Sequence, residues 1–342
     1  MTPINLALTG YGYGAKVFHL PFWRADARFR LVKIHSRSAS EPPPGFPGTE
    51  LVRDFDALLT PEIDAIVITT PNPSHAELTR RALQAGKHVV VEKPLCAGRA
   101  EGEALYALAA AKNRLLAVYH NRRWDSGPLT LAALLATGRL GPPVDVFLRL
   151  ERYAAGLNAK RWKETGEPGV GLLYDLGPHL FDMALRLFGR PQQLAADVRR
   201  QHPGALSDDN FTVNLYYANG LKIVLGASKY AREPAPFLVC HGTAASYVKA
   251  QPDNQEGLLA AGVLPRGDWN RERPRDWGLL HDEHGRQPLA SVPGHYGAFY
   301  ANFYEALRGR APLAVQKAEV LAVLELLELS GASAEQGCRL PV

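Results

Sequence analysis

The sequence is poor in cysteine and contains no long apolar run. Its 342 residues include three cysteines, Cys96, Cys240 and Cys338, which are widely spaced. That spacing excludes a CxxC-type metal site and makes a disulfide framework an unsuitable interpretation. No run approaches the roughly eighteen apolar residues of a membrane-spanning helix, so we expect no membrane partner. The first residues lack the charged and apolar regions of a secretory signal, and we expect a cytoplasmic protein.

Blocks of like charge are also missing. The chain has 39 Lys and Arg residues against 34 Asp and Glu residues, a formal net charge of +5. Without a basic run that carries interleaved aromatic residues, a nucleic-acid partner is not expected. With 46% hydrophobic and 21% charged residues, the composition is that of a globular protein, and the length suits two domains.

The first third of the chain alternates between short apolar strands and helices. Such alternation with short connections predicts a doubly wound parallel sheet. Asp54 is expected to cap a short helix, and Ser74 a longer one that stops at Gly86. Segment 41–48, with four prolines, can only be a loop. The predicted strands are 4–9, 29–35, 64–70, 88–91 and 115–119, and the predicted helices are 15–27, 54–59, 74–86 and 100–112.

After about residue 125 the pattern changes to strands joined by hairpins. Asn219-Gly220 separates two alternating segments, a strong hairpin signal. We expect an open, mostly antiparallel sheet in a second domain, residues 125–342, after a first domain of residues 1–124. Segment 251–285 is expected to form long loops, and the final helices to pack back on the first domain. The expected strands are 144–153, 211–217, 221–228 and 237–241, and the expected helices are 129–137, 174–188, 296–308 and 315–330.

A glycine-rich segment directly follows the first predicted strand. It reads Gly10-Tyr11-Gly12-Tyr13-Gly14-Ala15 and matches G-x-G-x-x-[G/A]. The first glycine permits a tight turn, the second lets the main chain approach a pyrophosphate, and a small third residue lets helix and strand pack closely. Amides at the start of the following helix receive the phosphate charge. We therefore expect a dinucleotide site here; the alternative is a glycine turn without a ligand.

The end of the second predicted strand bears on which dinucleotide binds. It reads His35-Ser36-Arg37-Ser38, with no acidic residue before Glu41. An acid at this place binds the adenosine ribose and repels a 2′-phosphate, whereas Arg37 and the Ser36 hydroxyl would bind that phosphate. The sequence predicts NADP. NAD is the alternative, with Arg37 a solvated loop charge or stacked on adenine.

Three ionisable residues are candidates for the chemistry. Lys93 follows the fourth predicted strand, in Glu92-Lys93-Pro94, where it could stabilise a developing negative charge on a reacting hydroxyl. Asp175 and His179 share one face of a predicted helix, and histidine suits proton transfer near neutrality. Each residue also has a structural alternative. Lys93 could form an ion pair with Glu92, Asp175 could be placed to interact with the helix dipole, and His179 could be a hydrogen-bonded core histidine.

Together these strings resemble the Gfo/Idh/MocA oxidoreductases over nearly the whole chain. The resemblance rests on the order and spacing of the glycine turn, Thr70-Pro71-Asn72-Pro73-Ser74-His75, Ala85-Gly86-Lys87-His88-Val89, Glu92-Lys93-Pro94 and the pair Asp175/His179. It implies a Rossmann domain at 1–124 and a substrate-binding and oligomerisation domain at 125–342. It also implies a tightly held NAD(P) and a site that acts on sugars or polyols.

Roles for individual residues are carried by this resemblance. Lys93 resembles the catalytic lysine, Asp175 the orienting acid and His179 the general acid/base. Tyr119-His120-Asn121-Arg122-Arg123-Trp124, Phe18-His19-Leu20-Pro21 and Arg161-Trp162 resemble the subgroup that contains NADP-dependent scyllo-inositol dehydrogenase. The implied cofactor-side residues beyond the glycine turn are Ser36, Arg37, Thr70, Pro71, Asn72, His75, Glu92, Lys93, Asn121, Arg161 and Trp162.

The resulting hypothesis is an oxidoreductase that interconverts a secondary alcohol and a ketone on a sugar or cyclic polyol. Lys93 and His179 would meet at one oxygen of the substrate, and no metal is needed for hydride transfer. We expect a homodimer or homotetramer. Two alternatives stay open: a regulator that senses NAD(P) without turnover, and a reductase of a non-sugar carbonyl, imine or pyrrole.

Overall fold

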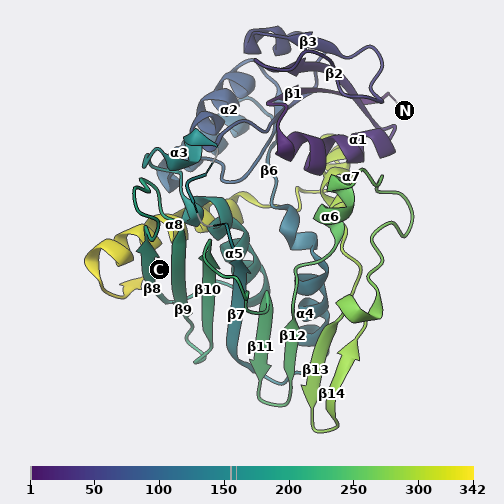
Figure 1. Cartoon of the computed structure of the whole chain (residues 1–342). Helices are drawn as coiled ribbons and strands as arrows, with labels where there is room; N and C mark the ends of the chain where they lie inside the picture. The colour runs from purple at the N-terminus through teal and green to yellow at the C-terminus, as the bar shows by residue number, and fades with distance from the viewer. Residues whose placement is uncertain (1, 155, 159) are drawn as a thin grey trace. The chain divides into compact units, whose positions relative to one another are not determined.

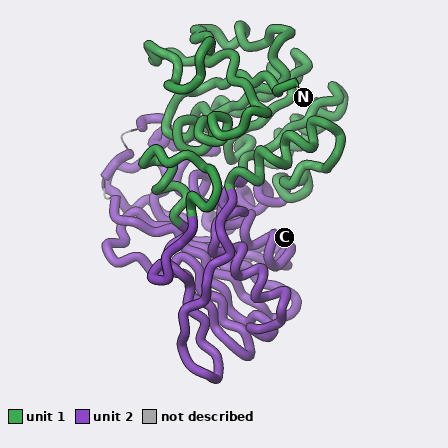
Figure 2. The backbone as a smooth tube through the Cα atoms, turned by 90° about the vertical axis from the view of Figure 1, so that its right-hand side faces the viewer, with its two compact units in different colours: residues 1–119, 254–270, 296–320 green, residues 120–253, 271–295, 321–342 purple. Residues whose placement is uncertain are grey.

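The computed structural model describes residues 2–154, 156–158 and 160–342, which form two compact units (Figures 1 and 2). Unit 1 contains residues 1–119, 254–270 and 296–320. Unit 2 contains residues 120–253, 271–295 and 321–342. Each unit is therefore assembled from three separate segments of the chain, as the two colours in Figure 2 show.

Unit 1 is built on a six-stranded parallel sheet. Its strand order, β3-β2-β1-β4-β5-β6, is that of a doubly wound dinucleotide-binding fold, which confirms the predicted parallel sheet. The central strands are buried on both faces: Ile66, Val67, Val90 and Val91 have no exposed surface, as continuous β-branched runs predict. The strands are β1 (Ile4–Thr9), β2 (Phe29–His35), β3 (Glu50–Val52), β4 (Ala65–Ile68), β5 (His88–Val91) and β6 (Leu116–Val118).

The helix expected at 15–27 is present as far as Ala25, but it is irregular. A π-helical turn, η1 (Ala15–His19), leads directly into a short α-helix, α1 (Leu20–Ala25). Pro21 lies in the first turn of α1. Because proline has no N–H to donate to the preceding turn, a regular α-helical hydrogen-bond pattern through this position is disfavoured.

The other helices of the amino-terminal segment follow the prediction closely. Asp54 caps the short turn η2 (Phe55–Leu58) by accepting a hydrogen bond from the Asp56 amide, 3.1 Å. Ser74 occupies the N-cap position of α2 (His75–Gln84), but its hydroxyl donates to the Pro71 carbonyl, 2.7 Å, so the expected side-chain cap is wrong. Gly86 ends this helix region with a φ of +74°. The remaining helices of unit 1 are η3 (Asn72–Ser74), α3 (Arg99–Ala111), α6 (Gln255–Ala260) and α7 (Gly297–Leu307).

Unit 2 is built on a nine-stranded sheet in the order β14-β13-β12-β11-β7-β10-β9-β8-β15. All neighbouring pairs are antiparallel except β7 and β10, which run parallel, so the expected mostly antiparallel sheet is confirmed. The strands are β7 (Pro143–Glu151), β8 (Gln193–Arg199), β9 (Asn210–Tyr216), β10 (Lys222–Ser228), β11 (Leu238–Gly242), β12 (Ser246–Lys249), β13 (Gly278–Asp282), β14 (Gly285–Leu289) and β15 (Leu340–Pro341).

The long helix α5 (Leu172–Phe188) packs against β7, β9 and β10 of this sheet (Figure 1). Asp208 fixes its start: the carboxylate accepts a hydrogen bond from the Leu173 amide, 2.6 Å, and the Asp208 carbonyl accepts one from the Leu172 amide, 2.9 Å. Gly189, with a φ of +77°, follows the last turn as predicted. The other helices of unit 2 are η4 (Asn121–Trp124), α4 (Ser126–Ala136), η5 (Arg161–Glu164), η6 (Pro274–Asp276) and α8 (Lys317–Gln336), whose first turn lies in unit 1.

Segment 251–285 is not the set of long loops that we expected. It contains α6, η6 and β13, and β8, β12 and β14 are further strands that the sequence did not reveal. These elements are short and largely polar, so neither hydrophobic period is visible in them. Strand pairing supplied by neighbouring chain segments stabilises them instead.

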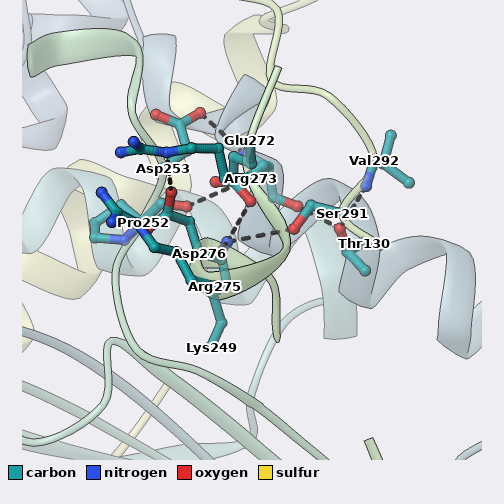
Figure 3. Close-up of polar contacts among 11 residues, drawn as sticks. Thr130, Lys249, Pro252, Asp253, Glu272, Arg273, Arg275, Asp276, Ser291 and Val292 are labelled. Atoms are coloured by element: carbon teal, nitrogen blue, oxygen red, sulfur yellow. Dashed lines mark hydrogen bonds and ion pairs between the residues drawn. The ribbon is translucent and has the colours of Figure 1, made fainter. Parts of the chain in front are cut away.

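A buried polar cluster organises the end of β12 (Figure 3). The Lys249 ammonium, 1% exposed, donates to Glu272 Oε2 at 2.6 Å and Ser291 Oγ at 3.3 Å, and also to the Asp276 carbonyl. Glu272 in turn accepts a hydrogen bond from Ser126 Oγ, 2.7 Å, at the start of α4. The cluster thus joins β12, α4 and segment 271–295 of unit 2.

No helix within the described residues has both the length and the apolar character needed to cross a membrane.

Candidate functional site

The glycine turn after β1 has a backbone that only glycine fits. Gly10 has a φ of +89°, and a Cβ there would lie 2.9 Å from the main chain of Thr69 and Thr70. Gly10 is also tied to the neighbouring strands, since its amide donates to the His35 carbonyl, 3.1 Å, and its carbonyl accepts from Thr69 Oγ1, 2.7 Å. A Cβ on Gly12, by contrast, would meet nothing within 4 Å. The turn therefore leaves open space over Gly12, as an approaching pyrophosphate requires.

Two tyrosines of the turn have defined partners within unit 1. The Lys16 ammonium lies 4.6 Å from the centre of the Tyr11 ring. Tyr13 is half exposed, and its hydroxyl donates to Glu256 Oε1 of α6, 3.2 Å. Gly14 precedes η1, and Ala15, the small third residue of the motif, is fully buried. The sequence did not foresee that α6 contacts this turn.

Arg53, which the sequence analysis did not single out, follows β3, and its guanidinium lies at the carboxyl end of β2. Ser36 is buried, and its hydroxyl accepts a hydrogen bond from the Ala39 amide, 3.1 Å, while Arg37 is exposed. The Arg53 guanidinium donates to the Ser36 carbonyl, 2.6 Å. Both guanidinium groups therefore belong to the loop region that follows β2 and β3, and no acidic side chain precedes Glu41 there.

His75 links the ends of β4 and β5. It is fully buried, with Nε2 at 2.8 Å from the Thr70 carbonyl oxygen and Nδ1 at 2.7 Å from the Pro94 carbonyl oxygen. Burial lowers the pKa of His75 below its ordinary value, although both carbonyl contacts oppose this shift. A neutral imidazole carries one N–H and donates to one of these oxygens. Pro71 and Asn72, between Thr70 and His75, are half-buried.

Glu92 and Lys93 follow β5 directly, and both are half-buried. Glu92 Oε2 accepts a hydrogen bond from the Lys93 amide, 3.2 Å, and Oε1 lies 3.8 Å from where a Cβ on Gly14 would be. Burial would raise the pKa of Glu92, but a hydrogen bond from His19 and the charges of Lys93 and His75 outweigh it and lower that pKa. An ionised carboxylate thus lies between the glycine turn and Lys93.

In unit 2, the first turns of α5 carry Asp175 and His179. His179 is 7% exposed, and Asp175 lies in the first turn, where the helix dipole favours a carboxylate. Asp175 Oδ2 accepts a hydrogen bond from the Lys163 ammonium, 2.5 Å, and both side chains are partly exposed. Lys163 belongs to η5, immediately after Trp162, whose ring centre lies 5.3 Å from the ammonium. The sequence named Arg161 and Trp162 in this turn and missed Lys163.

The turn η4 is held against α5 by a buried ion pair. Arg123, 1% exposed, donates through Nε and Nη2 to the two carboxylate oxygens of Asp182, at 2.7 and 2.6 Å. Asn121 is buried in the same turn, whereas Arg161 of η5 is exposed. This bidentate pair gives Arg123 a structural function within unit 2 in addition to any contact with a ligand.

Comparison with known proteins decides the family. A model described as "Oxidoreductase family, NAD-binding Rossmann fold" (GFO_IDH_MocA) matches residues 4–120. A second, "Oxidoreductase family, C-terminal alpha/beta domain" (GFO_IDH_MocA_C), matches residues 132–342. The chain belongs to the Gfo/Idh/MocA family. The resemblance inferred from the sequence, and the Rossmann fold that it implies, are thereby confirmed.

Similar members of the Gfo/Idh/MocA family include proteins with and without a described activity. The uncharacterized oxidoreductase YdgJ of Escherichia coli is 40% identical, over 97% of this chain and 96% of its own. The NADP(+)-dependent scyllo-inositol 2-dehydrogenase IolW of Bacillus subtilis is 34% identical, over 97% of this chain and 94% of its own. The solved structure of yvaA from Bacillus subtilis, 33% identical, superposes with a TM-score of 0.94 and covers 100% of this chain and 99% of that one.

For this member of the Gfo/Idh/MocA family, the residues that the sequence missed share one property. Arg53, Lys163 and Glu256 all act on a named site residue or its element through contacts from another chain segment. No short motif marks them. Only Lys163 had a local signal, because it adjoins the Arg161-Trp162 string.

Proposed function

We propose that this oxidoreductase interconverts a secondary alcohol and a ketone on a sugar or cyclic polyol, with NADP as the preferred dinucleotide. The observation that carries the proposal is the 34% identity, over nearly the full length of both chains, to an NADP(+)-dependent scyllo-inositol 2-dehydrogenase. Lys93, Asp175 and His179 supply an ammonium, a carboxylate and an imidazole for such a reaction. A D-apiose dehydrogenase and an inositol 2-dehydrogenase are more distant relatives, 26% and 29% identical.

The residues of unit 1 fit a dinucleotide. The tight, close-packed turn at Gly10 and the open space over Gly12 suit the pyrophosphate. The guanidinium groups of Arg37 and Arg53 and the lack of an acidic residue between the end of β2 and Glu41 favour a 2′-phosphate at the adenosine end. When bound, the nicotinamide supplies the hydride acceptor for alcohol oxidation.

The chain's own residues move the proton and stabilise charge. In the direction of oxidation, His179 takes the proton of the substrate hydroxyl, and Lys93 stabilises the oxygen as negative charge develops on it. Asp175 orients the reacting groups, and Lys163 holds Asp175 in one rotamer through their ion pair. In the reverse direction the same imidazole returns the proton to the oxygen.

The test is an absorbance assay at the wavelength of reduced nicotinamide, with both dinucleotides, against inositols, aldoses and ketoses. Lys93→Ala and His179→Ala should each lower kcat by about 10²–10⁴-fold, the usual contribution of a general acid/base, while NADP still binds. Lys163→Met should lower kcat less, and Lys160→Met, which removes an exposed ammonium beside the same turn, is its matched control. Wild-type rates in both alanine variants would refute the assignment, and turnover of none of the substrates would favour a dinucleotide sensor.

The proposal includes assembly into a homodimer or homotetramer. In β9 the side chains of Phe211, Val213 and Leu215 are buried beneath α5, whereas the intervening residues are more exposed. A sheet that buries one face in its own unit offers the other face to a second copy. Light scattering coupled to gel filtration tests this, and a monomer at micromolar concentration would contradict it.

A further inference from the structure

His19 is a fully buried histidine to which the proposed reaction assigns no task. It lies at the end of η1, in the string Phe18-His19-Leu20-Pro21. Its Nε2 lies 3.0 Å from Glu92 Oε1, and its Nδ1 lies 2.5 Å from the hydroxyl oxygen of Tyr300. The imidazole also packs on the Tyr119 ring, with 4.4 Å between ring centres. All four residues belong to unit 1.

The ionisation of Glu92 determines which atoms donate in the hydrogen-bonded series Tyr300–His19–Glu92. An ionised carboxylate only accepts hydrogen bonds, so Nε2 of His19 carries the proton that it donates to Glu92. In the neutral imidazole Nδ1 is then an acceptor, and the Tyr300 hydroxyl donates to it. Burial raises the pKa of the Tyr300 hydroxyl well above its ordinary value, so Tyr300 keeps its proton. Donation therefore runs from Tyr300 to His19 to Glu92.

Both carboxylate oxygens of Glu92 are used in this arrangement. Oε1 accepts from His19, and Oε2 accepts from the main-chain amide of Lys93. The carboxylate is therefore held at both ends, and the Lys93 amide is held with it. Tyr300 comes from α7, which is 281 residues away from His19 in the chain, so a distant element reaches Lys93 through two side chains.

We propose that His19, oriented by Tyr300, is a positioning residue that fixes Glu92 and through it the main chain of Lys93. The inference rests on the proposed function, in which Lys93 stabilises the reacting oxygen. It gives the Phe18-His19-Leu20-Pro21 string a task, and it explains why a short π-helical turn follows the glycine motif: that turn presents the imidazole at its last residue.

Loss of the imidazole changes the charge of Glu92 as well as its position. The groups that face Glu92 are His19 from η1, His75 from α2, Lys93 beside it, and the hydroxyls of Tyr119 and Tyr300. Without the His19 hydrogen bond, less opposes the effect of burial, so the pKa of Glu92 is higher in His19→Leu than in the unaltered protein. We therefore expect the turnover of His19→Leu to fall more steeply with decreasing pH than that of the unaltered enzyme.

The test compares four variants by four readouts. His19→Leu removes the donor, His19→Gln keeps an N–H donor for Glu92, and Tyr300→Phe removes only the hydroxyl that orients His19. His88→Leu is the matched control, because it removes a half-buried histidine at the opposite end of the same strand, β5. The readouts are the ¹⁵N shifts of the His19 ring, the amide proton shift of Lys93, and the pH profile of kcat with the dissociation constant of NADP.

We expect His19 in the unaltered protein to carry a proton on Nε2. His19→Leu should shift the Lys93 amide upfield and lower kcat at pH 7 at least about tenfold, with a change in the NADP dissociation constant of less than about threefold. His19→Gln should restore most of the turnover, and Tyr300→Phe should lie between the two. His88→Leu should change neither the Lys93 amide nor the shape of the pH profile.

Two results would overturn the inference. One is a folded His19→Leu variant whose Lys93 amide shift and pH profile match those of the unaltered protein. If that variant does not fold, Tyr300→Phe is decisive. The inference is then overturned if the Lys93 amide shift, the pH profile and the His19 ring shifts of Tyr300→Phe all match those of the unaltered protein. The proposed function fails separately, when the unaltered protein oxidises no polyol; the ring and amide shifts then still decide whether His19 holds Glu92 and the Lys93 main chain.

Discussion

Replacing Lys249 by methionine should destabilise unit 2 more than any loss of a surface charge. Methionine keeps the apolar stem but removes an ammonium that is 1% exposed and has three oxygen partners (Figure 3). Among the described residues, the Glu272 carboxylate, 4% exposed, would keep only the hydrogen bond from Ser126, 2.7 Å. A buried carboxylate without its counter-charge is costly, because the protein interior replaces its lost hydration poorly.

The expected loss is about 3–5 kcal/mol of unfolding free energy, the range found when one partner of a buried ion pair is removed. That is a large part of the roughly 5–15 kcal/mol that stabilises a typical domain. The matched control is Arg275→Met, which removes a 70% exposed guanidinium, 3.8 Å from Asp276, in the same chain segment. Exposed pairs of this kind contribute about 0–1 kcal/mol.

Urea denaturation followed by far-ultraviolet circular dichroism measures both variants, with the slope m checked for constancy. In Lys249→Met the Glu272 carboxylate is left without its counter-charge. The double variant Lys249→Met/Glu272→Leu removes that carboxylate as well, so it should regain most of the lost stability. The reasoning is refuted if Lys249→Met costs no more than Arg275→Met, or if the double variant is less stable than Lys249→Met alone.

Three further predictions rest on single contacts. Gly10→Ala should cost about 1–2 kcal/mol from backbone conformation alone, plus the clash with the main chain after β4, and should abolish dinucleotide binding in a fluorescence titration. Arg37→Ala and Arg53→Ala should each lower the preference for NADP over NAD by about 10–100-fold in paired dissociation constants; an unchanged ratio in both would contradict the NADP assignment. Burial raises the pKa of Asp208 from 3.8 to about 6, so the folded state binds that proton more tightly, and the resulting stabilisation, about 3 kcal/mol, is present below pH 4 and lost as the pH rises to about 6. Asp208→Asn should flatten this part of the stability profile in urea titrations at stepped pH, and a wild-type slope in the variant would argue against it.

The sequence predicted those parts of the fold in which one segment alone determines its structure. Strands 29–35 and 88–91 were placed correctly to the residue, because the apolar residues of each segment are bounded by polar or turn-forming residues. The helix predicted at 15–27 is helical through Ala25, but Pro21 prevents a regular α-helical pattern, and its first turn is π-helical. The elements within 251–285 were missed because a six-residue helix, a three-residue turn and a five-residue strand are too short to show a period of their own.

The candidate site likewise contains residues that local sequence predicts and contact partners that it does not. Gly10 could be predicted, since the residue type follows from a backbone conformation and a close approach that no other residue tolerates. The partners of predicted residues could not. His19 meets Glu92 and Tyr300 across 73 and 281 positions of sequence, and Arg53 meets Ser36 across 17. Nothing in a local pattern distinguishes His19 from an ordinary core histidine.

The register of the parallel sheet made the dinucleotide side predictable from sequence. Thr9 of β1 pairs with Ile68 of β4, and Ile68 pairs with Val91 of β5, so the residues directly after these three strands emerge at one edge. The Thr69 amide donates to the Thr9 carbonyl, and the Glu92 amide donates to the Ile68 carbonyl, which continues the alignment one residue further. Three motifs that are far apart in sequence thereby become neighbours by topology alone. Segments 254–270 and 296–320 obey no such rule, because they return to unit 1 from elsewhere in the chain and bring Glu256 and Tyr300 to that edge. In such a fold, side chains at the carboxyl ends of the parallel strands can be assigned to the site from sequence, whereas the contribution of the returning segments has to be established by mutation.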